Sequence, residues 1–402
     1  MGSGPWIKAD VVKNHDKAIK WPLIHQLFLI GRFSLPSLPV LEPIAMAPSC
    51  LPKLSFLSIQ IAAAFTAVLS TSPLVHAQSL AQGAGSNTST IRIGGSSTVF
   101  PIMVEAIRAF REAGNSTKIE LKETGTSDGF RRFCAGQLEI ANASRPINSK
   151  ELKACSSKRI NFIELPIAFD ALTIVVHPSN TWAKQISTNE LARLWGRQAE
   201  GKIDRWNEVN LDWPDRPIKL CGPGKDSGTY DYFNKAINGN AENTRRDYAS
   251  SENDNVIVRC VAQNPNALGY FGLSYYKANQ DKLRALGIVT SSGTVIPSVA
   301  SVQSGRYQPF SRPLFIYIND KALASRPDLQ KFTTFTVRNG LRFVGKSGDI
   351  PLPASTYQLV ESKLYKRITG SAFSGDLPVG LSIGEALRRS FDANKQPQFR
   401  SF

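Results

Sequence analysis

The chain has 402 residues, enough for two or three domains, and a formal net charge of +16 at pH 7. Its lysines and arginines form no compact block of five or more, so a dedicated nucleic-acid-binding arm is not indicated. Of the four histidines only His177 lies beyond residue 77, so a Ser-His-Asp relay or a His-rich zinc site would depend on that residue alone. The scarcity of histidine therefore argues against hydrolase chemistry.

The first 77 residues carry patterns of their own. Residues 1–45 are irregular, and we expect them to be an upstream artefact, with translation starting at Met46. An apolar run over 54–69 and a small-residue cleavage site at 75–77 predict a secretory signal peptide over 46–77. A transmembrane anchor is the alternative, but the apolar run is too short to favour it.

Beyond the predicted signal peptide, the chain is basic. The first 77 residues hold six Lys/Arg and three Asp/Glu, so the remainder keeps a net charge of +13. Such a balance favours an anionic ligand, nucleic acid or an anionic membrane as partner. Residues 78–90 are polar and rich in Gly, Ser and Asn, and we expect them to form a flexible lead-in.

The chain has five cysteines, of which Cys50 lies in the predicted signal peptide. An even number of cysteines in an exported chain suggests disulfides, and four cysteines allow three pairings. We favour Cys134–Cys155 and Cys221–Cys260, because each pair falls within one predicted domain. Free buried thiols are the alternative.

Strand patterns then alternate with helical patterns, which predicts a mainly parallel α/β sheet. Three times, at 91–95, 119–122 and 216–220, a strand ends in a turn rich in Gly, Ser and Thr before a helix. The residues of these turns are Ser97, Thr98 and Val99, then Thr126, Ser127 and Asp128, then Asp226, Ser227, Gly228 and Thr229.

Each of these turns lies at a helix N-terminus, where unpaired N–H groups and the positive end of the dipole favour an anion. For any one turn, a plain Ser/Thr cap is the alternative. In open α/β sheets ligands bind at the carboxyl ends of strands. Three such turns would therefore surround a small tetrahedral anion with N–H and O–H donors.

Further elements follow the same alternation. A short strand over 139–146 ends in a polar turn with Ser144 and Arg145. The other expected strands are 160–166, 168–176, 267–272 and 314–318. The other expected helices are 189–195, 256–262, 329–340 and 357–365. Residues 247–255 are expected to form an acidic turn. The 168–176 strand is long enough to cross between lobes. Three tryptophans, Trp195, Trp206 and Trp213, suit core packing, with stacking on a sugar or nucleobase as the alternative.

Several motifs in a fixed order resemble the phosphate-binding proteins of phosphate-specific ABC importers, in particular their cyanobacterial-like branch. The motifs are GSSTV (95–99), FCAG (133–136), ANASRPI (141–147), GPGKDSGTYDYF (222–233), ALGYFG (267–272) and SRPLFIY (311–317). The resemblance implies a type II periplasmic-binding-protein fold, α/β, with two lobes that each have a central mixed β-sheet flanked by helices. It places the ligand cleft at the hinge, and we expect lobe I over 91–171 and 276–402 and lobe II over 172–275.

The resemblance also implies which residues contact phosphate. The matching positions are Ser97, Thr98, Val99, Thr126, Ser127, Ser144, Arg145, Ser227, Gly228 and Thr229. The family pattern has an Asp after the serine equivalent to Ser144, and that Asp accepts the proton of bound phosphate. This chain has Arg145 there, and Pro223 stands where the pattern has an Arg four residues before Ser227.

We expect Arg145 to pair bidentately with phosphate oxygens. A proton acceptor is still needed to distinguish hydrogen phosphate from sulfate, because an unprotonated anion would leave that acceptor facing an oxygen. Asp128 and Asp226 are the candidates, with Asp170 and Asp254 behind them. For Asp226, a simple cap or turn role is equally consistent with the sequence.

The expected function is therefore non-catalytic binding of inorganic phosphate in the periplasm and delivery to a membrane permease. We expect a monomer, with no cofactor, metal or nucleic acid. A binder of another oxyanion, such as sulfate or molybdate, is the alternative in the same class. A phosphoesterase with Ser97 or Ser227 as nucleophile is a third hypothesis, but no base or metal-ligand cluster accompanies either serine in the sequence.

Overall fold

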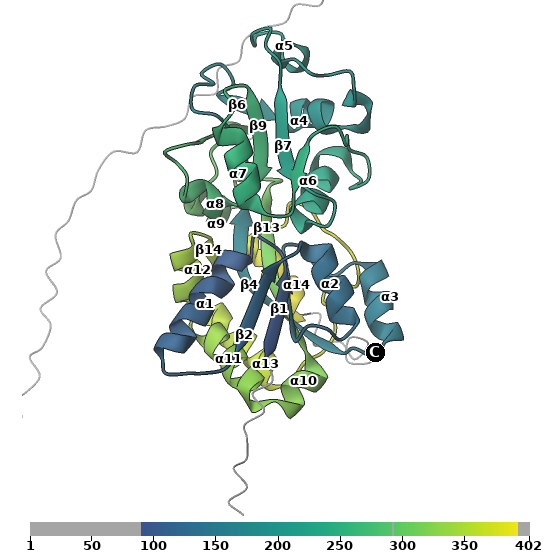
Figure 1. The fold of residues 1–402 in the computed structure, drawn as a ribbon, viewed down its shortest axis with the longest axis vertical. Coiled ribbons are helices and arrows are strands. Elements are labelled where there is room, and N and C mark those ends of the chain that lie inside the picture. Colours follow the sequence, from purple (N-terminus) through teal and green to yellow (C-terminus); the bar gives the residue numbers. More distant parts are fainter. Residues whose placement is uncertain (1–89, 292, 393–402) are drawn as a thin grey trace, which may run out of the picture. The chain divides into compact units, whose positions relative to one another are not determined.

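A computed structural model describes residues 90–291 and 293–392 of the chain (Figure 1). The predicted upstream artefact, the signal peptide with Cys50 and nearly all of the lead-in lie outside the described residues. Within the described ranges, no helix is both long enough and apolar enough to span a membrane. The fold is α/β with two lobes, each built on a mixed sheet, as predicted.

Lobe I contains a six-stranded sheet with the order β14-β4-β13-β3-β1-β2. Its strands are β1 (Ile91–Gly95), β2 (Ile119–Glu123), β3 (Ile140–Ala143), β4 (Phe162–Ala171), β13 (Ser311–Asn319) and β14 (Ile350–Pro351). β1 pairs in parallel with β2 and β3, whereas β13 is antiparallel to both β3 and β4. β14 is also antiparallel to β4, so two of the five strand pairs are parallel and the prediction of a mainly parallel sheet is wrong for this lobe.

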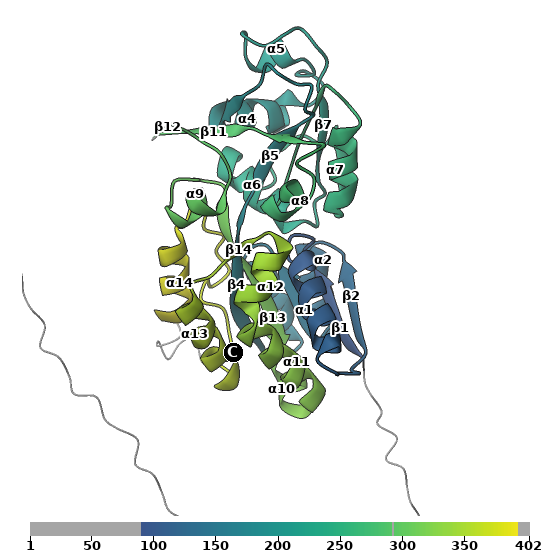
Figure 2. The same ribbon diagram turned by 90° about the vertical axis from the view of Figure 1, so that its left-hand side faces the viewer.

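Helices cover both faces of the lobe I sheet (Figures 1 and 2). They are α1 (Phe100–Glu112), α2 (Thr126–Cys134), α3 (Ser149–Ser157), α10 (Asp320–Ser325), α11 (Pro327–Arg338), α12 (Gly340–Ser347), α13 (Ala354–Tyr365) and α14 (Ile383–Asp392). β13 shows why two layers form, since successive side chains of a strand point to opposite faces. Leu314 and Ile316 belong to the apolar cluster of α1, while Phe315 and Tyr317 belong to the cluster of α2 and α3.

Lobe II contains a five-stranded sheet, order β10-β5-β9-β7-β8, and a three-stranded sheet, order β12-β11-β6. The strands are β5 (Thr173–Val176), β6 (Gln185–Ser187), β7 (Lys219–Pro223), β8 (Ala249–Ser251), β9 (Ala267–Phe271), β10 (Arg284–Ala285), β11 (Gly287–Thr290) and β12 (Gly293–Val295). The helices that follow residue 171 and precede β13 are α4 (Thr188–Trp195), α5 (Trp206–Val209), α6 (Gly228–Asn238), α7 (Asp254–Ala262), α8 (Leu273–Lys277) and α9 (Val299–Gln303).

The core of lobe II is aromatic. Trp195 is fully buried and contacts the rings of Phe233, Tyr248 and Tyr270 edge-on. Trp206 is also fully buried, and it packs against Trp213 with ring centroids 5.4 Å apart. Core packing is therefore the role of these tryptophans, and their use as an exposed stacking platform is excluded.

The chain passes from one sheet to the other at Leu172, between β4 and β5. The prediction of two separate strands over 160–166 and 168–176 is wrong, because β4 is one strand of ten residues that runs through Pro166. Pro166 pairs with Phe315 and Ala168 with Leu314, so β4 has one extra residue at a bulge here. A bulge accommodates proline, which has no N–H to give to the ladder.

We expected the chain to return to lobe I at 275/276. β10 pairs with β5, and β11 pairs with β6, so residues 284–290 extend the sheets of lobe II. The boundary at 275/276 stays a prediction, and the strand pairing favours a return between Val295 and Ser311.

Both predicted disulfides form. Cys134 in α2 is bonded to Cys155 in α3, and Cys221 in β7 is bonded to Cys260 in α7. Free buried thiols are excluded for these four residues. The predicted turn over 247–255 is wrong in two places, because 249–251 form β8 and α7 already begins at Asp254, capped by the side chain of Asn253.

Candidate functional site

The turn after β1 in lobe I meets the start of α6 in lobe II. The hydroxyl oxygens of Thr98 and Thr229 lie 3.3 Å apart, and both residues are fully buried. Their sequence separation is 131 residues, yet the two strand–turn–helix junctions face each other as predicted. Two hydroxyl groups from opposite lobes therefore meet at one point.

The second junction lies against the same part of α6. Thr126 Oγ1 and Ser144 Oγ are 3.3 Å apart, and the Ser144 N–H donates to Thr126 Oγ1 at 3.2 Å. A methyl group added to Gly228 would lie 2.7 Å from both of these hydroxyl oxygens. Such a contact is too close for a real Cβ, so only glycine lets this loop of lobe II approach lobe I. Five predicted residues are thus brought together: Thr98, Thr126, Ser144, Gly228 and Thr229.

The other predicted residues of these turns also act as local caps or bridges. The Ser227 side chain accepts a hydrogen bond from the Thr229 N–H at 3.1 Å. Ser227 therefore caps α6, which is the role given by the alternative of a plain Ser/Thr cap. The Ser127 N–H donates to the Asp226 carbonyl at 2.8 Å across the lobes. Val99 is buried and precedes α1. The Ser97 carbonyl accepts a hydrogen bond from the Tyr275 hydroxyl at 3.1 Å.

Arg312, at the start of β13, is a site residue that sequence reasoning missed. It is fully buried, and its Nη2 donates to Thr229 Oγ1 at 2.9 Å and to Thr98 Oγ1 at 3.2 Å. Its Nε and Nη2 also donate to Asp170 Oδ2 at 3.0 and 2.8 Å. Its Nη1 has no hydrogen-bond partner among the residues that the structure describes. The only sequence signal was the place of this arginine inside the SRPLFIY motif, in an otherwise apolar strand.

Arg145 is held by protein groups instead of facing the two threonines. Its Nη1 and Nη2 donate to the two carboxylate oxygens of Glu151 at 2.8 and 2.7 Å. Nε donates to Asp231 Oδ2 at 2.6 Å, and Nη2 also donates to Ser127 Oγ at 2.9 Å. Although burial opposes the charge, Glu151 and Asp231 raise the pKa of Arg145 above its usual value. Arg145 thus makes a bidentate pair with Glu151, and its predicted pair with phosphate stays a prediction.

The two leading candidates for the proton acceptor lie near the surface. Asp128 accepts from Arg131 at 2.7 Å, and Arg131 also lies 3.5 Å from Asp226. The side chains of Asp128 and Asp226 are 21% and 32% exposed, so water reaches both carboxylates. Asp170 is buried, but it is paired with Arg312. All three carboxylates therefore already have an arginine partner.

Asp254, the first residue of α7, has the environment that the other candidates lack. It is fully buried, and neither carboxylate oxygen has a hydrogen-bond partner within the described part of the chain. Burial raises its pKa to about 8, with Arg312 and the Ser97 side chain lowering it and Glu123 raising it.

Hydrolase chemistry finds no support in the described residues. His177, the one histidine between residues 90 and 392, is partly buried and hydrogen-bonds Ser179 at 2.7 Å. The Ser227 hydroxyl is engaged by the Thr229 N–H. No group of three or more His, Cys, Asp or Glu that could hold a metal ion occurs in the part of the chain described.

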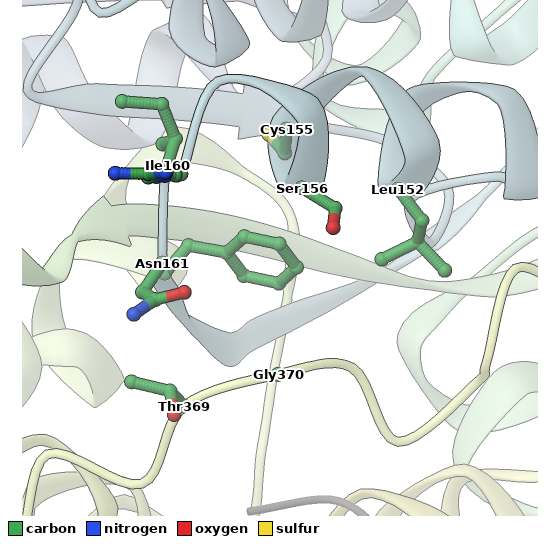
Figure 3. Close-up of a pocket in the computed structure, with 9 residues that line it drawn as sticks. Leu152, Cys155, Ser156, Ile160, Asn161, Thr369 and Gly370 are labelled. Atoms are coloured by element: carbon green, nitrogen blue, oxygen red, sulfur yellow. The ribbon is translucent and has the colours of Figure 1, made fainter. Parts of the chain in front are cut away.

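A separate pocket of about 260 Å³ lies in lobe I beside α3 (Figure 3). Figure 3 shows Leu152 and Ser156 from α3 facing Asn161, Thr369 and Gly370. None of the predicted ligand residues lines this pocket. It is therefore distinct from the junction of the lobes.

A family model described as a PBP superfamily domain matches residues 81–339. The chain is similar to Protein SphX of Synechocystis, with 42% identity over 300 residues that cover 75% of this chain and 89% of that protein. It is similar to the phosphate-binding protein PstS of Staphylococcus saprophyticus, with 32% identity over 281 residues, 70% of this chain and 86% of that protein.

Two solved structures are similar as well. One is a possible phosphate binding protein from Planctomyces limnophilus, with 38% identity, a TM-score of 0.52, and coverage of 69% of this chain and 98% of that chain. The other is a putative phosphate ABC transporter substrate-binding protein with bound phosphate from Clostridium perfringens, with 26% identity, a TM-score of 0.56, and coverage of 66% and 100%.

Proposed function

The chain belongs to the PBP superfamily, and from this premise we propose that it binds inorganic phosphate between its lobes and delivers it to a membrane permease. One relative is named a phosphate-binding protein, and one solved neighbour holds bound phosphate. We also propose that the protein is exported to the periplasm by its predicted signal peptide, acts as a monomer and catalyses no reaction. The pair of intralobe disulfides supports an oxidising compartment.

One observation carries the assignment of the site: the buried Nη1 of Arg312 without a partner in the described residues. A buried cationic nitrogen without an acceptor is costly, and an anion would satisfy it. The hydroxyl groups of Thr98 and Thr229 already lie on the same guanidinium. Phosphate bound here would receive charge-assisted hydrogen bonds from Arg312 and neutral ones from both lobes.

We assign the proton-reading role to Asp254. Hydrogen phosphate carries a proton that sulfate lacks at neutral pH, so a buried acceptor can distinguish the two ions. Asp254 is the candidate whose carboxylate is fully buried and unpaired in the described chain. Burial raises the pKa of Asp254 to about 8, whereas Arg312 opposes this rise and favours the ionised form, which is the form that accepts a proton from the ligand.

Calorimetric titration of the mature protein with phosphate, arsenate, sulfate and molybdate tests the function. We expect tight binding of phosphate and weak binding of sulfate and molybdate. Arg312→Lys should weaken phosphate binding at least about tenfold, because hydrogen bonds to charged groups are worth roughly 1.5–3 kcal/mol and tenfold is about 1.4 kcal/mol. Arg338→Lys, on an exposed ion pair with Glu361, is the matched control.

Three results would count against this proposal. Sulfate or molybdate binding tighter than phosphate would move the protein to the alternative oxyanion class. Wild-type affinity in Arg312→Lys would remove that residue from the site. Turnover of a chromogenic phosphate ester that disappears in Ser227→Ala would indicate a phosphoesterase.

A further inference from the structure

Arg145 and Asp231 join the lobes at a point apart from the Thr98–Thr229 contact. Arg145 follows β3 in lobe I, and Asp231 lies in α6 of lobe II. Their Nε and Oδ2 atoms are 2.6 Å apart, and the Arg145 side chain is only 2% exposed. This ion pair therefore crosses from one lobe to the other and is shielded from water.

Glu151 fixes the arginine on the lobe I side. It accepts two hydrogen bonds from the Arg145 guanidinium and one from the Asn148 N–H, the latter as part of the capping box of α3. The Pro146 carbonyl accepts a further hydrogen bond from Nη1 at 3.1 Å. Arg145 is thus anchored within its own lobe and presents Nε to lobe II.

We infer that Arg145, Asp231 and Glu151 form a latch between the lobes that sets phosphate affinity without touching the ligand. The inference rests on the proposed function only for its affinity readout. A contact that exists in the closed arrangement and is lost on opening raises the closed population. Apparent affinity falls in proportion when the binding-competent state is less populated.

The latch is part of a longer seam between the lobes. Beside it, the Ser127 N–H donates to the Asp226 carbonyl at 2.8 Å, and Arg131 lies 3.5 Å from Asp226. The Arg145 guanidinium also donates to Ser127 Oγ, so the two contacts share a residue. Asp231 is the charged residue of lobe II that pairs with Arg145, so its replacement removes this ion pair and leaves lobe I unchanged.

Asp231→Asn is the discriminating variant, because asparagine keeps the shape and loses the charge. As a latch residue it should weaken phosphate affinity by about three- to tenfold. The loss should appear as faster phosphate dissociation, because the latch acts after the ligand has bound. If Arg145 bound phosphate directly, as its position in the motif suggested, removing Asp231 would leave affinity unchanged or improve it.

A double-mutant cycle with Arg145→Ala and Asp231→Asn separates the two roles further. A latch predicts that the double variant binds no worse than the weaker single variant, since both changes break one contact. Should Arg145→Ala fail to fold, Arg145→Lys replaces it in the cycle. Asp281→Asn, at an exposed ion pair in lobe II, is the matched control and should bind phosphate like wild type.

A second readout does not need phosphate. Small-angle scattering of the ligand-free protein should give a larger radius of gyration for Asp231→Asn than for wild type or Asp281→Asn. Wild-type affinity together with unchanged scattering would overturn the latch. A wild-type protein that fails to bind phosphate would overturn the proposed function, while the scattering comparison would still decide the latch.

Discussion

The side chain of Asp254, at the start of α7, is fully buried, and these surroundings favour its protonated form. Burial is the largest cause of its raised pKa, and Glu123 adds to it while Arg312 opposes it. The same surroundings would make the carboxylate a strong acceptor for a proton carried by the ligand. A residue of this kind affects which anion binds more than how tightly anions bind in general.

Asp254→Asn should therefore change anion selectivity. The amide can donate to an unprotonated oxygen, so we expect phosphate affinity to fall at least about tenfold and sulfate affinity to rise. Competition calorimetry at pH 7 measures both. Asp128→Asn and Asp226→Asn are controls that should leave the phosphate-to-sulfate ratio unchanged, since water reaches both carboxylates and both lie near Arg131. A shifted ratio in either control, with none in Asp254→Asn, would contradict the assignment.

At this scale the sequence predicted the hydroxyl donors well and the charged residues poorly. Thr98, Thr126 and Thr229 carry local signals, because each follows a strand and begins or precedes a helix. Arg145 depends on partners that are six and 86 residues away in the chain, which no local pattern reveals. Arg312 reaches the site only because β13 lies between β3 and β4.

Among the elements, α6 makes the closest approach between lobes. Its first residue, Gly228, leaves no room for a side chain between Thr126 and Ser144. The contact involves the helix start itself, so the helix cannot shift aside without disturbing the Ser227 cap. The position of α6 therefore controls how far the lobes can close.

Gly228→Ala should block closure. The methyl group would lie 2.7 Å from two hydroxyl oxygens, and overpacking of this kind costs about 1–3 kcal/mol, so phosphate affinity should fall about tenfold or more. Gly345→Ala in α12 is the matched control, because nothing lies within 4 Å of its added carbon. Calorimetry for affinity and thermal unfolding without ligand separate a closure defect from a folding defect. Equal phosphate affinity in the two variants would show that the gap at Gly228 is not needed.

The elements that sequence patterns missed have short or weak apolar stripes. Helix α3 buries only Cys155, so its apolar period is faint. Its capping box between Asn148 and Glu151 was nevertheless readable in the sequence. β8 has three residues, and such a strand is defined by its partner β7 more than by its own pattern.

For the molecule as a whole, several buried acids have raised pKa values. Burial is the first cause for Asp254, Asp349 and Glu123. The folded protein therefore keeps protons that the unfolded chain releases above about pH 4. An acid whose pKa is higher in the folded state than in the unfolded chain contributes stability at low pH. That contribution is lost as pH rises toward the pKa in the folded state, which is about 8 for Asp254.

We expect the free energy of unfolding without ligand to fall by about 2 kcal/mol or more between pH 5 and pH 8, since one retained proton corresponds to about 1.4 kcal/mol per pH unit. Urea unfolding at the two pH values measures this change. Asp254→Asn should flatten the dependence, because the amide does not titrate. A wild-type protein that becomes more stable from pH 5 to pH 8 would contradict the prediction.

The placement of the two sulfur bridges has a mechanical consequence. One joins α2 to α3 and the other joins β7 to α7, so each stays inside a single lobe. Covalent bonds of this kind stiffen each half, and neither of the two ties one half to the other. If the halves move apart when ligand is released, as the proposed function requires, neither bond resists that movement.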